Sequence, residues 1–144
     1  MTADTIFQIC NILALIGWIL LVLLPNWWAI DKFIIGVVIT MFAIVYSGLV
    51  FGAFNAHQFQ NFNSLDGVMQ LFRNRSILTA GWIHYLAFDL LAGVFIRKNA
   101  IQHGISHWLV LIPLIITFLL GPLGLLLYLL IRFIVTREYF AENF

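Results

Sequence analysis

Two ionisable side chains, His84 and Asp89, lie well inside a long apolar stretch that runs from Ile77 to Ile96. A charged side chain at the centre of a bilayer costs roughly 2.5–3.5 kcal/mol on insertion scales, so Asp89 requires a partner or a function. A carboxyl and an imidazole can serve as the acid and the base of a proton transfer. The sequence therefore predicts an acid–base site on this segment.

The spacing of these residues on a helix shows how such a site would be arranged. Five residues separate His84 from Asp89, which places them about 140° apart around a helix of 3.6 residues per turn. They cannot stack on one face, but they can flank a cavity from two sides. Steps of four residues also define a slowly drifting small or polar stripe, which should face other helices. This stripe comprises Gly81, Tyr85, Asp89, Gly93 and Arg97. In the alternative reading, Asp89 and His84 are only hydrogen-bonded to neighbouring helices.

Other candidate sites are weaker. His103 and His107 have the i, i+4 spacing of metal ligands, but two ligands make an incomplete zinc site, and no metal site is predicted. His57 and His84 are a candidate pair of axial haem ligands. The single cysteine excludes an internal disulfide, and motifs for nucleotide binding and for nucleophilic catalysis are absent.

The composition indicates that the surrounding solvent is lipid. Of the 144 residues, 63% are hydrophobic and 9% are charged, whereas roughly 25% are charged in a typical soluble domain. The net charge is +1 and no basic run is present, which excludes nucleic acid as a partner. Membrane lipids are the expected surroundings.

Four apolar runs are long enough to cross a hydrocarbon core about 30 Å thick. We therefore predict an all-α integral membrane protein, a single transmembrane domain of residues 1–144 with four spanning helices in a small bundle. The predicted spans are residues 6–24, 33–54, 77–96 and 108–134. Pro113 and the pair Gly121-Pro122 predict a kink in the fourth span.

Three further features follow from these spans. After the candidate cap Ser64, the helical spacing of apolar residues predicts a short interfacial helix between the second and third spans. Gly48 and Gly52 have GxxxG spacing, which favours close helix packing and permits a homodimer. Four spans place both termini on one side, which a small excess of positive charge assigns to the cytoplasm.

The third span resembles the abscisic-acid-deficiency-four-like family of small membrane proteins, whose plant members are neoxanthin synthases. The resemblance is carried by the run from Gly81 to Leu90, with Trp82, His84 and Asp89 as its specific part. It continues in residues 65–68, 106–108 and 119–128, the latter two being typical of bacterial-type members. The long N-terminal transit segment expected of plastid members is missing, so we expect either a prokaryotic cytoplasmic membrane or a mature form.

The resemblance implies an isomerase that acts on a carotenoid and needs no cofactor. Family members of this type convert the epoxide violaxanthin to the allene neoxanthin, and cis–trans isomerisation is a related reaction. The expected catalytic residues are His84, Asp89 and Tyr85, with Asp89 as the acid and His84 as the base, or the reverse. The expected substrate-binding residues are Trp82, Asn55, His57, Thr117 and Tyr128.

Two other functions stay open at this point. The chain could bind a carotenoid or another apolar lipid-phase molecule without catalysis, or be an accessory membrane subunit. A b-type haem protein or a proton relay is the third alternative.

Overall fold

The computed structural model describes residues 2–24, 27–53 and 56–137, and the regular elements in this part are all helical. The helices are α1 (Ala3–Leu23), α2 (Ile30–Phe33), a π-helix (Ile34–Ile39), α3 (Thr40–Ala53), a 3-10 helix (Ala56–Asn63), α4 (Leu65–Leu71), α5 (Arg75–Gln102), α6 (His107–Leu120) and α7 (Pro122–Thr136). The predicted all-α class is confirmed.

Three helical segments are long and apolar enough to cross a membrane: α1, the continuous segment Ile30–Ala53, and α5. They correspond to the first three predicted spans. Each begins where the sequence supplies a capping residue or turn; the Asn74 side chain, for example, accepts hydrogen bonds from the backbone of Ser76 and Ile77 at the start of α5. The second segment contains a π-helix that the sequence did not predict.

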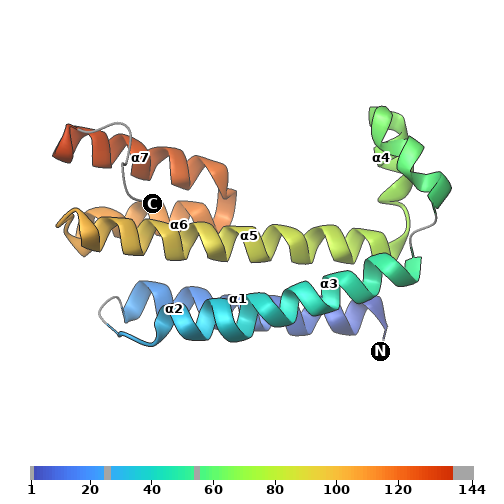
Figure 1. Cartoon of the computed structure of the whole chain (residues 1–144), viewed down its shortest axis with the longest axis horizontal. Coiled ribbons are helices and arrows are strands. Elements are labelled where there is room, and N and C mark those ends of the chain that lie inside the picture. Colours follow the sequence, from blue (N-terminus) through green and yellow to red (C-terminus); the bar gives the residue numbers. More distant parts are fainter. Residues whose placement is uncertain (1, 25–26, 54–55, 138–144) are drawn as a thin grey trace.

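These three segments lie side by side, with α5 in contact with both others (Figure 1). Their buried apolar side chains form one core, which includes Leu21 of α1, Phe42 of α3 and Leu90 of α5. Glycines bring α1 and α5 close together. A Cβ atom at Gly93 would stand 2.8 Å from the Trp18 ring, and one at Gly17 would stand 3.0 Å from Leu90.

The region predicted as a fourth span is a hairpin of two helices, α6 and α7, which pack against each other (Figure 1). The chain reverses at Gly121, whose φ of 38° favours glycine, and Pro122 begins α7. A Cβ atom at Gly124 would stand 2.2 Å from the Thr117 backbone nitrogen, so the two helices touch closely. The prediction of one kinked spanning helix is therefore wrong. At 1.5 Å per residue, α6 is about 21 Å long and α5 about 42 Å.

The hairpin enters and leaves at the same end of the bundle. Its turn reaches the middle of α5, where the Tyr85 hydroxyl donates a hydrogen bond to the Leu119 carbonyl. Its second helix returns to the C-terminal end of α5, where Tyr128 and Arg132 both donate to Asn99. The described ends of the chain therefore lie at opposite ends of the bundle, in contrast to the predicted arrangement with both termini on one side (Figure 1).

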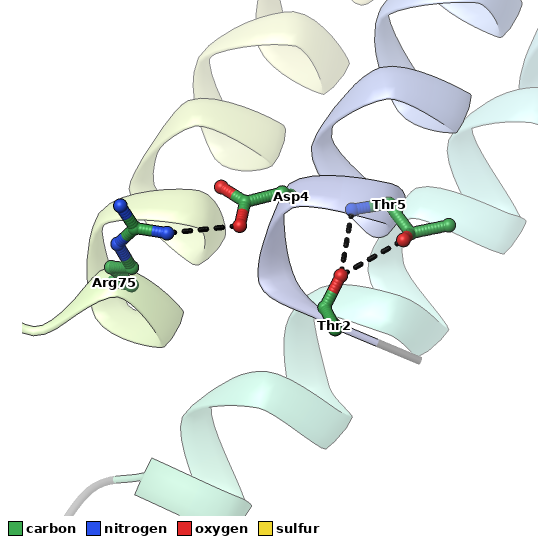
Figure 2. A network of polar contacts seen from close by, with 4 residues as sticks. All are labelled: Thr2, Asp4, Thr5 and Arg75. Atoms are coloured by element: carbon green, nitrogen blue, oxygen red, sulfur yellow. Dashed lines mark hydrogen bonds and ion pairs between the residues drawn. The ribbon is translucent and has the colours of Figure 1, made fainter.

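At the other end of the bundle, the first turns of α1 and α5 are joined by an ion pair (Figure 2). Arg75 Nη1 lies 2.9 Å from Asp4 Oδ2, and both side chains are largely exposed. The Thr2 hydroxyl caps α1 by accepting from the Thr5 backbone nitrogen. Such exposed pairs contribute little to the free energy of unfolding, so we expect this contact to add little to the stability of the bundle.

Two smaller predictions have different outcomes. The short helix after Ser64 is present as α4, and the Ser64 hydroxyl accepts a hydrogen bond from the Gly67 nitrogen at 3.1 Å. The glycines of the GxxxG pair, by contrast, do not mediate packing within the described chain. A Cβ atom at Gly48 or Gly52 would meet nothing within 4 Å. The homodimer stays a prediction.

Candidate active site

Asp89 lies at the midpoint of α5, next to the turn of the α6–α7 hairpin at Gly121. Its side chain is 7% exposed, and its Oδ2 atom has no hydrogen-bond partner among the described residues. A Cβ atom at Gly121 would stand 2.5 Å from Asp89 Oδ1. Only a glycine leaves room for this carboxyl group at the turn.

Tyr85 lies one helical turn before Asp89 and beside it. Its hydroxyl donates to the Leu119 carbonyl at 3.2 Å, in the last turn of α6. Tyr85 therefore links the carboxyl group of α5 to the backbone of the hairpin. Its ring also contacts that of Trp82 at a tilt of 40°, with 5.4 Å between the ring centroids.

His84 lies on a different side of α5, toward α3. Its ring centroid lies 4.5 Å from that of Phe88 and 5.8 Å from that of Tyr46. His84 also lines a cavity of about 400 Å³, here called the His84 cavity, between α3, the α4 region and α5. Its other lining residues are Tyr46, Val50, Phe62, Leu71, Phe72, Ile77, Ala80 and Gly81.

The three predicted catalytic residues thus form two groups. Tyr85 and Asp89 are neighbours under the hairpin, whereas Asp89 does not line the His84 cavity. The two side chains face different directions from α5, as their spacing predicts, but they do not flank the His84 cavity from two sides as expected, because Asp89 is not among its lining residues. His84 and Asp89 are not in direct contact in the structure.

The small or polar stripe faces other elements along its whole length, as predicted, but its partners change as it winds around α5. Gly81 lies against the Phe72 ring, Asp89 against Gly121, and Gly93 against Trp18. At its end, Arg97 forms a 2.7 Å ion pair with Asp31 and donates to the Trp27 carbonyl.

The predicted substrate-binding residues are dispersed. Trp82 is 40% exposed, donates to Asn11 Oδ1 at 2.8 Å, and lines a second cavity with Asp4, Phe7, Arg75, Leu78 and Thr79. Thr117 and Tyr128 are fully buried within the protein and donate to the Pro113 carbonyl and to Asn99. Asn55 and the side chain of His57 lie outside what the structure describes.

Asn99 is a buried polar residue that the sequence did not single out. It is 2% exposed, and its Oδ1 atom accepts hydrogen bonds from Tyr128 at 2.6 Å and Arg132 at 3.2 Å. Its position at the polar end of the third apolar run was the only available signal. It fixes the return of α7 onto α5.

The histidines that could suggest a metal have other contacts. His103 Nδ1 lies 2.8 Å from the Asn99 carbonyl oxygen, and His107 Nε2 lies 3.0 Å from the Val22 carbonyl oxygen. Among the described residues, no group of three His, Cys, Asp or Glu side chains is placed to hold a metal ion.

Comparison with known proteins places the chain in a family. The family model described as ABA DEFICIENT 4-like matches residues 5–128, which include Asp89, His84 and the hairpin turn. No curated protein matches the chain. No solved structure matches it either. Because the family model covers most of the sequence, the chain belongs to the ABA DEFICIENT 4-like family.

Proposed function

We propose that the protein is a membrane-embedded isomerase that acts on a carotenoid by acid–base chemistry, as a neoxanthin synthase does. One observation carries the proposal: Asp89 is a buried carboxyl group with an oxygen that lacks a hydrogen-bond partner among the described residues. Buried polar groups are normally paired, and an intramembrane carboxyl group is a functional candidate by default. Family membership supports the choice of substrate class.

The reaction needs one acid and one base. The acid protonates the epoxide oxygen as its carbon–oxygen bond breaks, and the base removes a proton from the adjacent polyene carbon. The electron pair of that carbon–hydrogen bond forms the allene, so the product is an isomer and no electrons are gained or lost. Protonated Asp89 is the proposed acid and His84 the proposed base, although these two roles can be exchanged.

Tyr85 has a positioning role in this scheme. Its hydroxyl lies beside Asp89 and donates to the Leu119 carbonyl, so it fixes the carboxyl group relative to the hairpin. His84 and Tyr85 are adjacent in sequence, and their side chains diverge by about 100° around α5. The proposed acid and the proposed base therefore act from different sides of α5.

The surroundings suit a substrate that dissolves in lipid. A carotenoid is about as long as the hydrocarbon core is thick, and apolar sites with few polar groups are typical for such ligands. Trp82 contributes a partly exposed aromatic surface on the side of α5 that faces α1. No cofactor is part of the proposed reaction.

The burial of Asp89 favours a second candidate, a carotenoid-binding or accessory subunit without catalysis. In that case Asp89 serves only to hold the hairpin turn at Gly121. The two candidates differ in whether product formation requires the carboxyl group.

The test is expression in cells that accumulate violaxanthin, with chromatography of the extracted pigments. The wild-type chain, Asp89→Asn, His84→Phe and an empty vector are compared, with Ile112→Leu on the exposed surface of α6 as the matched control. We expect a neoxanthin or isomer peak that the two site variants lose and the control keeps. An unchanged pigment profile with inserted wild-type protein would exclude this reaction on violaxanthin and favour the binding role.

A further inference from the structure

The His84 cavity has the construction of a ligand site. Its walls come from four elements, with Val50 from α3, Phe62 from the 3-10 helix, Leu71 from α4, and His84 from α5. Its volume of about 400 Å³ lies at the lower end of the 300–1,000 Å³ range of small-molecule sites. It can hold one end of an extended lipid-phase molecule and is too small to enclose a molecule that spans the bilayer.

Small side chains make this space. Ala80 and Gly81 form the α5 wall, where larger residues would fill the cavity. A Cβ atom at Gly81 would stand 2.5 Å from the Phe72 ring. Gly81 therefore allows Phe72, which follows α4, to pack closely on α5 and form one side of the cavity.

His84 and Tyr46 are the lining residues with polar side-chain atoms, and His84 is the one to which we assign ligand selection. The rings of Phe88 and Tyr46 flank its imidazole and hold its orientation. An imidazole nitrogen can donate to, or accept from, one oxygen of a ligand, while the aromatic and aliphatic walls contact a ring. The cavity opens at the protein surface, since Phe62 and Phe72 are 56% and 40% exposed.

We infer that the His84 cavity binds the oxygen-bearing cyclic end group of an isoprenoid lipid, with His84 hydrogen-bonded to the oxygen. This inference rests on the proposed function for the class of ligand, and it adds the place where the ring end binds. The polyene then extends from the cavity into the surrounding lipid.

The experiment measures binding to the purified full chain in lipid nanodiscs, without requiring any reaction. The probes are β-ionone, 3-hydroxy-β-ionone and the straight-chain ketone 2-tridecanone, which share thirteen carbons. The readouts are the dissociation constant and the NMR signal of the ¹⁵N-labelled His84 imidazole. We expect both ring probes to bind and the straight chain to bind at least several-fold more weakly. The hydroxylated ring should bind about three- to tenfold more tightly, as one net hydrogen bond provides.

Three variants separate the contributions. Ala80→Leu fills the cavity from α5 and Val50→Phe fills it from α3, and each should abolish ring binding. His84→Phe keeps the aromatic packing, so it should retain ring binding and lose the preference for the hydroxylated probe. Ile44→Leu, on the exposed face of α3, is the matched control. Circular dichroism and gel filtration identify the variants that fold. Two cavity-filling variants are included so that the test still works if one of them does not fold.

The outcomes distinguish this inference from the proposed reaction. Ring binding that both folded cavity-filling variants leave intact, or equal binding of the three probes, would overturn the inference. Carotenoid conversion that survives cavity filling would also overturn it, while the isomerase function would stand. Ring binding blocked by these variants, in a protein that converts no carotenoid, would support the site and contradict the proposed reaction.

Discussion

Asp89 and Gly121 are in direct contact, although they are 32 positions apart in sequence and Gly121 lies at the turn between α6 and α7. A Cβ atom at Gly121 would stand 2.5 Å from Asp89 Oδ1 and 3.2 Å from its carboxyl carbon. The close packing of the hairpin turn on α5 therefore depends on the absence of a side chain at Gly121, next to the buried carboxyl group of Asp89.

Gly121→Ala is expected to destabilise the protein and to displace Asp89. The positive φ of 38° alone costs a residue with a side chain about 1–2 kcal/mol, and the contact with Asp89 adds to it. Thermal unfolding in detergent measures the loss. In a double-mutant cycle, Asp89→Ala should recover part of it, whereas strictly additive effects would show that the two residues do not interact.

Tyr85→Phe removes one hydrogen bond and keeps the ring in contact with Trp82. We expect a loss of about 0.5–1.5 kcal/mol in unfolding free energy, which is the net value of one such bond. If Tyr85 positions Asp89, carotenoid conversion should fall more than this stability loss explains. Conversion at the wild-type rate would show that the hydroxyl serves the fold alone.

Substitution by alanine should lower the free energy of unfolding at Gly124 and raise it at Gly48. At Gly124 the added carbon would stand 2.2 Å from the Thr117 backbone nitrogen and 2.5 Å from the Pro113 carbonyl oxygen, which cannot move aside. We expect Gly124→Ala to cost about 1–3 kcal/mol or more. Gly48→Ala meets nothing and should stabilise α3 by about 0.5–1 kcal/mol. A large loss at Gly48 would instead reveal an intermolecular contact, which cross-linking in the membrane can detect.

Two ion pairs provide a comparison between a buried and an exposed contact. Arg97 and Asp31 have side chains that are 7% and 24% exposed, whereas Arg75 and Asp4 are 78% and 69% exposed. Asp31→Asn should cost about 3–5 kcal/mol, because it leaves the buried guanidinium without its carboxylate. Asp4→Asn should change stability by less than about 1 kcal/mol. Equal effects in thermal unfolding would contradict this difference in burial.

The first three spans could be predicted from the sequence because the length of an apolar run is a local property of the chain. Capping residues such as Ser64 are local as well, which explains why α4 begins where its spacing predicts. The π-helix has no such local signal among Ile34, Gly36 and Ile39, and in the structure it packs against α5 and α1.

The hairpin could not be predicted because the pair Gly121-Pro122 is compatible with both a kink and a reversal. The choice depends on contacts between distant residues, such as Gly124 against Thr117 and Tyr128 with Asn99. The same holds for the site. Asp89 and Tyr85 stand out in an apolar helix, but the carbonyl of Leu119 and the close approach of Gly121 require the folded chain.

The hairpin also changes how the positive charges are sorted across the membrane. With α7 returned to the C-terminal end of α5, that side carries five basic residues, namely Lys32, Arg97, Lys98, Arg132 and Arg137, and the opposite side carries Arg73 and Arg75. Positively charged segments are retained on the cytoplasmic face. The small excess of positive charge expected for four spans therefore becomes a clear asymmetry, and the basic residues gather at the end of the bundle where the hairpin enters and leaves.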